Sequence, residues 1–289
     1  MKKENTREAT LIKADYEQFR IFKAIYTGVD TKNVYSWEQR LEENNTEKDD
    51  CYFLMFEGKR IGGVHSAEDW IGGAFLIPPF SDRALFWHLL LKLKPAKFIY
   101  ESLDEDKDIV FKHGYKLTHT LKYMVRPSES IDSTLPEGFL CLPIDKDTNL
   151  EEVAMALKEG YRSGFVFDAS GELKIEDVLD GLNNDLNRFS VKNSCYKIVE
   201  DGTEKIVAVC LAGIAEGSSP MFSFIHELTV LSKYRGNGLG KYLISRVIND
   251  SKDSVPFVKL AFMVGNEAEL LYENLGFMSG SSISDFEQR

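Results

Sequence analysis

Residues 227–244 read ELTVLSKYRGNGLGKYLI, and this stretch decides the fold. The run from Phe222 to Val230 alternates in the manner of a strand, and apolar residues recur at helical spacing from Leu239 to Ile248. A glycine-rich loop separates the two. The sequence therefore predicts a strand, a tight loop and a helix in succession, the loop being Arg235-Gly236-Asn237-Gly238-Leu239-Gly240.

This loop has the composition of a diphosphate cradle. Glycines let backbone N–H groups approach a phosphate closely, and the unpaired N–H groups at the start of a helix favour an anion. The Arg235 guanidinium suits a pyrophosphate oxygen. The loop is not a Walker loop, because no Gly-Lys-Ser or Gly-Lys-Thr follows, and the G-x-G-x-x-G spacing of a dinucleotide fingerprint is absent. A turn that only caps the helix is the competing interpretation.

A second motif follows at residues 266–277, which read NEAELLYENLGF. Residues 227–244 resemble motif A of the GNAT acetyltransferase superfamily, with its Q/R-x-x-G-x-G/A signature between a strand and a helix. Residues 266–277 look like motif B of the same family, with its Asn, Tyr and Gly-Phe. The resemblance is specific over residues 222–277 and extends plausibly over 139–289.

The resemblance implies roles for individual residues. The loop from Arg235 to Gly240 should bind the pyrophosphate of acetyl-CoA through backbone amides, and the end of the preceding strand should pair with the pantetheine arm. Tyr272 should protonate the departing thiolate, although an ordinary tyrosine on the apolar face of a short helix is the simpler interpretation. The cofactor-binding residues implied are Leu228, Thr229, Val230, Arg235, Gly236, Asn237, Gly238, Leu239, Gly240 and Asn266.

The general base is sought on the strand before the loop. An attacking amine must lose a proton, and family bases are often acidic residues on this strand, so Glu227 is the first candidate. His226, which titrates near neutral pH, is the second. Side chains of neighbouring strand residues point to opposite faces unless a bulge changes the alternation. A solvated Glu227 and a core His226 are the competing interpretations.

The chain divides at a stretch rich in Pro, Ser, Gly and acid, residues 127–138, which is typical of a linker. We therefore expect one domain over residues 1–127 and a catalytic domain over 128–289. Each half has hairpin, strand, helix, strand and Gly-aromatic signals in the same order, so an internal duplication is plausible. The predicted class is α/β, with two tandem acetyltransferase-like domains, each a mixed and mostly antiparallel sheet flanked by helices.

The first half lacks the residues of a cradle. Where the loop should stand, residues 78–83 read PPFSDR, which contains no glycine, and proline offers no N–H to a phosphate. Ser81 or Asp82 would cap the next helix. Val110 falls at the position of Tyr272, and Asp104 at that of Asn266. We expect a degenerate copy that shapes the substrate cleft or supports the active half, and the sequence leaves both roles open.

Composition limits which ligands, metal sites and cellular compartment are expected. The net charge of -11 argues against a nucleic-acid surface, which needs clustered Lys and Arg. The four cysteines form neither a CxxC pair nor a Cys/His cluster, which argues against a zinc site and a disulfide framework. The N-terminus is polar and no run approaches 18 apolar residues, so we expect a cytoplasmic protein without a membrane segment.

These observations predict an N-acetyltransferase that moves an acetyl group from acetyl-CoA to a primary amine by direct attack in a ternary complex, with no metal. The acceptor would be a small molecule or a peptide amine, bound by variable segments around residues 159–168, and a homodimer is left open. The alternative is a CoA-binding regulatory module without transfer. A purely structural scaffold fits the first half but not the second.

Overall fold

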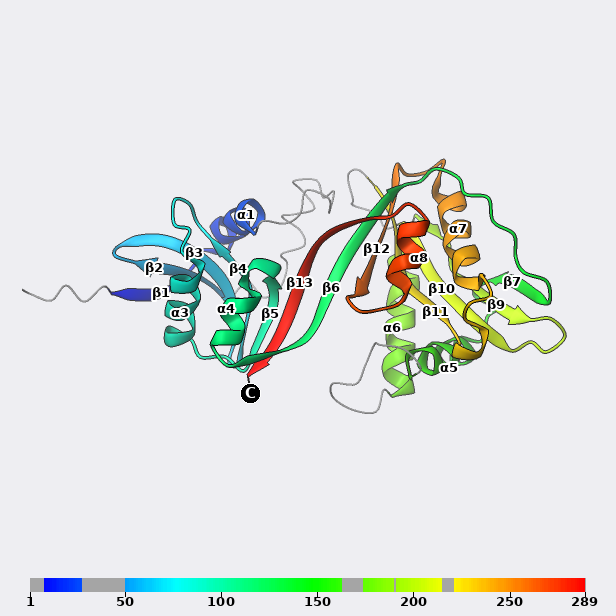
Figure 1. Ribbon diagram of the computed structural model, residues 1–289, viewed down its shortest axis with the longest axis horizontal. Helices are drawn as coiled ribbons and strands as arrows, with labels where there is room; N and C mark the ends of the chain where they lie inside the picture. The colour runs from blue at the N-terminus through cyan, green and yellow to red at the C-terminus, as the bar shows by residue number, and fades with distance from the viewer. Residues whose placement is uncertain (1–7, 28–49, 163–173, 190, 215–220, 289) are drawn as a thin grey trace, which may run out of the picture. The chain divides into compact units, whose positions relative to one another are not determined.

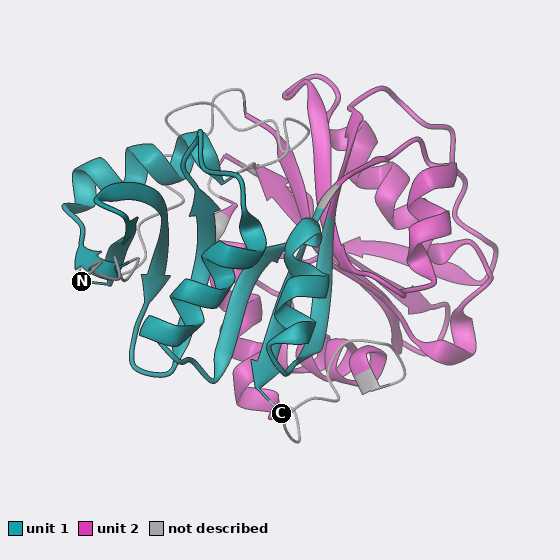
Figure 2. Ribbon diagram, turned by 60° about the vertical axis from the view of Figure 1, so that its left-hand side comes forward, with its two compact units in different colours: residues 1–122, 281–289 teal, residues 123–280 magenta. Residues whose placement is uncertain are grey.

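A computed structural model describes residues 8–27, 50–162, 174–189, 191–214 and 221–288. The chain forms two compact units, one of residues 1–122 with 281–289 and one of residues 123–280 (Figure 2). This division differs from the expected domains of residues 1–127 and 128–289 in two respects. The end of one long strand, from Tyr123, belongs to the second unit, and the last nine residues belong to the first.

The first unit has one sheet, with helices on both faces (Figure 1). Its strands lie in the order β1-β2-β3-β4-β5-β13-β6, and only β4 and β5 pair in parallel among the registers described. The strands are β1 (Ala9–Lys13), β2 (Cys51–Phe56), β3 (Lys59–Ser66), β4 (Trp70–Leu76), β5 (Phe98–Leu103), β13 (Met278–Gln288) and β6 (Tyr115–Pro127). The helices are α1 (Tyr16–Tyr26), α3 (Arg83–Leu93), the short η2 (Asp104–Asp106) and α4 (Lys107–Lys112).

Alternation along β2 explains these layers. Phe53 packs with Phe19 of α1 in one apolar cluster, while its neighbour Leu54 packs with Phe86 and Trp87 of α3 in another. Successive side chains of a strand point to opposite faces, so β2 contributes to both cores. The C-terminal strand β13 pairs antiparallel with β5, from Ile283 opposite Leu103 onward, and Phe286 is fully buried there.

The second unit repeats this architecture. Its sheet has the order β6-β12-β11-β10-β9-β7, and β8 pairs with β10. The neighbours β7, β9, β10 and β11 are antiparallel, and β11 and β12 are parallel. The strands are β7 (Phe139–Pro143), β8 (Lys192–Asn193), β9 (Tyr196–Glu200), β10 (Ile206–Ile214), β11 (Ser223–Val230) and β12 (Phe257–Met263). The helices are α5 (Leu150–Arg162), α6 (Ile175–Arg188), η3 (Ser232–Tyr234), α7 (Leu239–Ser251) and α8 (Ala268–Asn274).

Strand β10 is buried along its whole length because helices cover both faces of the sheet. Val209 and Leu211 pack against α5 and α6, while Ala208 and Cys210 pack against α7 and α8. Figure 1 shows the two helix pairs on opposite sides of β10 and β11. The predicted class, a mixed and mostly antiparallel sheet flanked by helices, is confirmed in both units.

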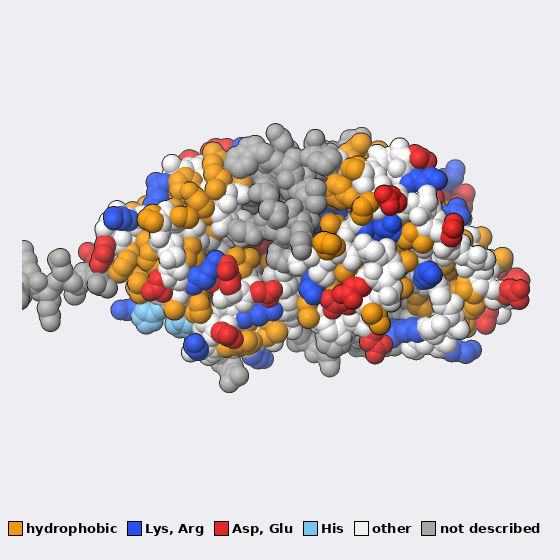
Figure 3. Space-filling view, turned by 45° about the horizontal axis from the view of Figure 1, so that its top comes forward, with side chains coloured by type: hydrophobic (Ala, Val, Ile, Leu, Met, Phe, Trp, Pro, Cys, Tyr) orange, Lys and Arg blue, Asp and Glu red, His pale blue; other side chains and the backbone are white. Residues whose placement is uncertain are grey.

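Charges of both signs are interspersed on the described part of the face seen in Figure 3. Within the described residues, no helix combines the length and the hydropathy that a membrane span requires. The same part of the chain holds no group of three or more His, Cys, Asp or Glu side chains arranged to bind a metal ion.

Candidate active site

Strand β11 contains a β-bulge at His226. Leu211 of β10 lies opposite Glu227, but the next residue, Ala212, lies opposite Ile225, so His226 is the extra residue. A bulge interrupts the alternation of side chains. As a result His226 and Glu227 both interact with the layer formed by α5 and α6, although they are neighbours in the sequence.

Asp185 of α6 and Tyr161 of α5 interact with the two neighbouring residues at the bulge, His226 and Glu227. Nδ1 of His226 lies 3.2 Å from Oδ1 of Asp185 in α6. Glu227 and the Tyr161 hydroxyl of α5 share a side-chain hydrogen bond. The sequence did not single out Asp185 or Tyr161, because neither belongs to a motif. Tyr161 does lie within the segment 159–168 expected to meet the acceptor, of which residues 163–168 lie outside the described residues.

The parallel pairing of β11 with β12 ends early. It runs from Ser223 opposite Val258 to Ile225 opposite Leu260, whereas β11 stays paired with β10 as far as Val230. The parallel register with β12 therefore stops just before the bulge. The segment Leu228–Val230, expected to meet the pantetheine arm, lies beyond the last of these parallel pairs.

The loop after β11 has the backbone that a cradle needs. Gly236 and Gly238 have φ values of +78° and +81°, in the left-handed region, which side chains other than glycine enter at a cost. A Cβ at Gly236 would meet nothing within 4 Å, and one at Gly238 only Pro136 Cγ at 3.9 Å. Backbone conformation therefore requires these two glycines, and the space above them is open.

Helix α7 begins at this loop without a side-chain cap. Gly238 is its N-cap residue and makes no side-chain hydrogen bond. Tyr242 N donates to Gly238 O over 2.9 Å, so the amides of the first turn before Tyr242 have no acceptor within the helix. Open space, left-handed glycines and unsatisfied amides all suit an anionic group such as a pyrophosphate.

The Arg235 guanidinium, expected to meet a pyrophosphate oxygen, donates hydrogen bonds to backbone carbonyls of its own unit. Its Nε donates to Val230 O at 3.0 Å and its Nη2 to Gly160 O at 3.4 Å. The guanidinium thus ties the end of β11 to α5. Asn237 also braces the loop, because its Nδ2 donates to Tyr234 O at 3.2 Å.

Glu227 has the electrostatics of a base that works near neutral pH. The pKa of Glu227 is raised to about 7: burial raises it most, the hydrogen bond with Tyr161 lowers it, and the nearby Asp185 charge raises it. A general base is most effective when its pKa is near the working pH. Such shifts also occur in purely structural clusters, so geometry must accompany them.

Tyr272 lies in α8 and is only 6% exposed. Its ring packs between Phe262 and Phe277, at centroid distances of 5.6 and 6.2 Å. Burial raises the pKa of Tyr272, and the neighbouring Cys210 and Glu227 add to that rise. The phenol is therefore held in its protonated form, the form a proton donor requires, within electrostatic reach of Glu227.

Asn266 supports the start of α8. Its Oδ1 accepts a hydrogen bond from Ala268 N at 3.0 Å, and its own N donates to Met263 O at 3.1 Å. The side-chain oxygen is thus used for a local turn, which leaves the cofactor contact expected of Asn266 to its amide group.

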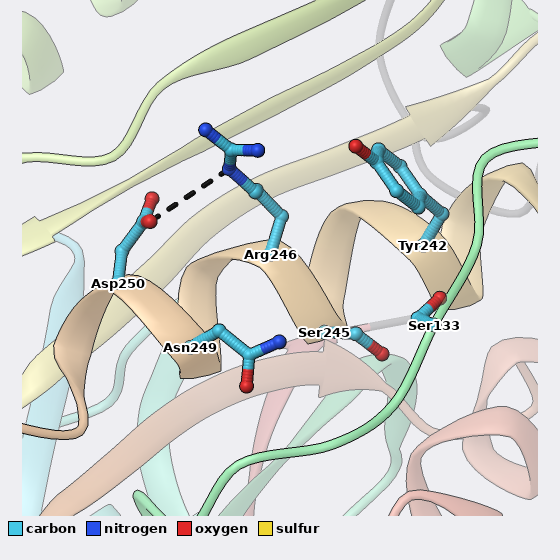
Figure 4. A pocket seen from close by; sticks show the side chains of 6 residues that line it. All are labelled: Ser133, Tyr242, Ser245, Arg246, Asn249 and Asp250. Atoms are coloured by element: carbon cyan, nitrogen blue, oxygen red, sulfur yellow. Dashed lines mark ion pairs between the residues drawn. The ribbon is translucent and has the colours of Figure 1, made fainter.

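A separate hollow of about 220 Å³ lies on the outer side of α7 (Figure 4). Arg246 and Asp250 form an ion pair at its rim, with 3.7 Å between Nε and Oδ1. The hollow contains no residue of the cradle and neither Glu227 nor Tyr272. Its lining residues are Ser133, Tyr242, Ser245, Arg246, Asn249 and Asp250.

Comparisons with known proteins agree with this geometry. The family model described as the acetyltransferase (GNAT) domain matches residues 192–279, which include β8 to α8 and thus the cradle, Glu227 and Tyr272. No curated protein matches the chain in sequence.

Solved structures share the fold over nearly the whole chain. A GCN5-related N-acetyltransferase from Sphaerobacter thermophilus is 14% identical, with a TM-score of 0.71, covering 97% of this chain and 95% of that one. A GNAT-family acetyltransferase from Colwellia psychrerythraea is 11% identical, with a TM-score of 0.58 and coverage of 98% and 100%. A tandem GNAT protein from the clavulanic acid biosynthesis pathway is 13% identical, with a TM-score of 0.56 and coverage of 96% and 98%. At such identities the likeness establishes the fold, and the domain match identifies residues 192–279 as an acetyltransferase (GNAT) domain.

Proposed function

We propose that the second unit transfers an acetyl group from acetyl-CoA to a primary amine by direct attack in a ternary complex. One observation carries the proposal. The parallel pairing of β11 with β12 ends at Ile225 opposite Leu260, just before Glu227, and the Glu227 charge helps to raise the pKa of Tyr272 on α8. This arrangement supports a base and an acid that act where the pairing ends, beside the open cradle.

Each group of the chain has a role in this proposal. The amides around Gly236 and Gly238 hold the pyrophosphate, and the segment Leu228–Val230 binds the arm of the cofactor. Acetyl-CoA supplies the activated acetyl group: the amine nitrogen gains a bond to the acetyl carbon, the carbon–sulfur bond breaks, and one proton is released. Glu227 takes a proton from the acceptor ammonium, and Tyr272 gives its proton to the departing thiolate.

We further propose that the first unit is a second copy of the fold without a cofactor site. Its β4 and β5 also pair in parallel over a short stretch, from Trp70 opposite Phe98 to Gly72 opposite Tyr100. Helix α3 is closed at its start, because Asp82 Oδ1 accepts from Leu85 N at 2.9 Å. An aspartate at this position would repel a diphosphate.

The space beside β4 in this unit is also filled. A Cβ on Gly73 would lie 2.9 Å from Lys23 Nζ and 3.2 Å from Glu101 Oε2. Lys23 is buried, and its Nζ lies 3.8 Å from that carboxylate oxygen. An ion pair between α1 and β5 therefore lies beside β4 just after the last pair of β4 with β5, Gly72 opposite Tyr100.

A thiol-release assay with acetyl-CoA tests the transfer. The acceptor panel should contain simple amines, polyamines, aminoglycosides and peptide N-termini, and the wild type should be compared with Tyr272→Phe and Gly238→Asp. We expect thiol release with at least one acceptor, a loss of about a hundredfold in kcat for Tyr272→Phe, and loss of acetyl-CoA binding for Gly238→Asp.

Two other outcomes would change the conclusion. A protein that binds acetyl-CoA but transfers to no acceptor supports the regulatory-module alternative. Unchanged CoA affinity in Gly238→Asp contradicts the cradle itself.

A further inference from the structure

Asp185 and His226 form a half-buried pair in the second unit. The two side chains are 16% and 19% exposed, and 3.2 Å separates Oδ1 of Asp185 from Nδ1 of His226. Two aromatic rings flank the imidazole, Phe224 at a centroid distance of 4.6 Å and Phe189 at 5.5 Å. These contacts fix both the position and the plane of the imidazole ring.

The pairing also selects a tautomer. A neutral imidazole has one N–H donor and one acceptor nitrogen, whereas an ionised carboxylate only accepts. The Asp185 carboxylate therefore places the proton on Nδ1 of His226 and makes Nε2 the acceptor atom. When Nε2 takes a proton, the resulting imidazolium lies beside a carboxylate that stabilises it.

The bulge gives this pair its chemical context. Without the extra residue, His226 and Glu227 would point to opposite faces of the sheet. With it, Tyr161 holds one of them and Asp185 the other, from two adjacent helices. Tyr161 and Asp185 shift the pKa of Glu227, and the Glu227 charge in turn raises the pKa of Cys210 and of Tyr272.

We propose that Asp185 is a positioning residue for the transfer reaction and that His226 Nε2 is a second proton acceptor beside Glu227. This inference rests on the proposed acetyl transfer. The amine enters as an ammonium and leaves as an amide, and one proton is released overall. The nitrogen therefore loses two protons: Glu227 takes the first from the ammonium, and after the attack an N–H bond of the now cationic nitrogen breaks while an Nε2–H bond forms on His226. One of these protons replaces the proton that Tyr272 gave to the thiolate and the other is released, and Asp185 stays ionised throughout.

A purely structural ion pair would make different predictions. Such a pair would hold α6 against β11, and its loss would lower stability without changing the tautomer of His226 or the chemical step. Asp185→Asn separates the two roles, because an amide keeps the shape of the carboxylate but can donate to Nδ1 and so favour the opposite tautomer. Asp180→Asn is the matched control, since Asp180 is an exposed acid on the same helix.

Ring ¹⁵N spectra of the whole protein measure the tautomer without substrate, with His226→Gln identifying the signals. We expect the Nδ1–H tautomer in the wild type and in Asp180→Asn, and a shift toward Nε2–H in Asp185→Asn. In the thiol-release assay we expect kcat of Asp185→Asn to fall by about ten- to a hundredfold with KM nearly unchanged, and Asp180→Asn to match the wild type.

The outcomes separate this inference from the proposed function. If the wild type releases thiol and Asp185→Asn keeps both its kcat and the wild-type tautomer, the positioning role is overturned while the transferase stands. If Asp185→Asn changes the tautomer but not kcat, His226 is not a proton acceptor in the reaction. If the wild type transfers to no acceptor, the proposed function fails, and the inferred proton step fails with it, whatever the spectra show.

Discussion

Gly160 of α5 lies directly against Thr229 of β11: a Cβ on this glycine would stand 2.4 Å from Cγ2 and 2.8 Å from Oγ1 of the threonine. This close approach brings Tyr161, the next residue of α5, to Glu227 on the same strand. Arg235 connects α5 to the segment after β11 by a hydrogen bond, because its Nη2 donates to Gly160 O. The position of α5, whose Tyr161 contacts the candidate base Glu227, therefore depends on a close contact that only glycine allows.

Gly160→Ala should disturb both stability and activity. The new methyl group overlaps Thr229, and overpacking of this kind costs about 1–3 kcal/mol. Urea unfolding should show that loss, and thiol release should fall because Tyr161 is displaced from Glu227. Thr229→Ala removes both clashing atoms, so the double variant should recover part of the loss. Additive effects of the two substitutions would contradict the contact.

The pH dependence of transfer should report Glu227. With its pKa raised to about 7, the carboxylate form is present above that pH and is lost as the pH falls through it. Because only the carboxylate accepts a proton, kcat/KM should fall about tenfold per pH unit below pH 7. An acid limb near pH 4.5 would mean that another group is titrating.

Two variants should shift the pH below which kcat/KM falls, the acid limb of the profile, in opposite directions. The Tyr161 hydroxyl stabilises the Glu227 carboxylate, so Tyr161→Phe should raise the pKa of Glu227 and move the limb to higher pH. The Asp185 charge destabilises the carboxylate, so Asp185→Asn should move the limb to lower pH. Both shifts are read from kcat/KM profiles, with Asp180→Asn as the control. A common direction for the two variants would exclude this electrostatic account.

The sequence predicted the framework of the site because its signals are local. Leu239 was expected to open a helix after two glycines, and α7 begins there behind a left-handed Gly238. Residues 201–202 read Asp-Gly, a sequence that favours a hairpin turn, and such a turn joins β9 to β10 there, with a positive φ at Gly202. Periodicity and turn chemistry act over a few residues, so they are readable without the fold.

The remaining features depend on contacts between segments distant in the sequence. No residue type marks the bulge at His226, which follows from its pairing with β10. Asp185 reaches His226 only because α6 covers that face of the sheet. Likewise, the pairing of β13 with β5, with Ile283 opposite Leu103, joins the last strand to the first unit. Strand patterns carry no information about which partner a strand will find.

The affinity for acetyl-CoA should be sensitive to one methyl group added at either of the left-handed glycines of the cradle. Gly236→Ala and Gly238→Ala each place a Cβ on backbone with positive φ, at a cost of about 1–2 kcal/mol. The loop should relax away from the cradle conformation, so calorimetry should show weaker acetyl-CoA binding, by about tenfold for a cost of this size.

Gly181→Ala provides the matched control for these substitutions. Gly181 lies within α6, and a Cβ there would meet nothing within 4 Å. Alanine is favoured over glycine in a helix by about 1 kcal/mol, so this variant should unfold at higher urea and bind acetyl-CoA like the wild type. Cradle variants with unchanged affinity would show that the loop is only a turn before α7.

Each chain should bind one acetyl-CoA. The first unit offers Asp82 as a closed cap at the start of α3 and the Lys23–Glu101 pair beside Gly73, whereas the second offers open amides before Tyr242. Calorimetric titration of the full chain should therefore give a stoichiometry of one, and Gly238→Asp should abolish it. Lys23→Ala opens the space beside Gly73 without removing the Asp82 cap, so it should not create a second site. A stoichiometry of two, or binding that survives Gly238→Asp with its affinity intact, would place a working cradle in the first unit and overturn its assignment as a degenerate copy.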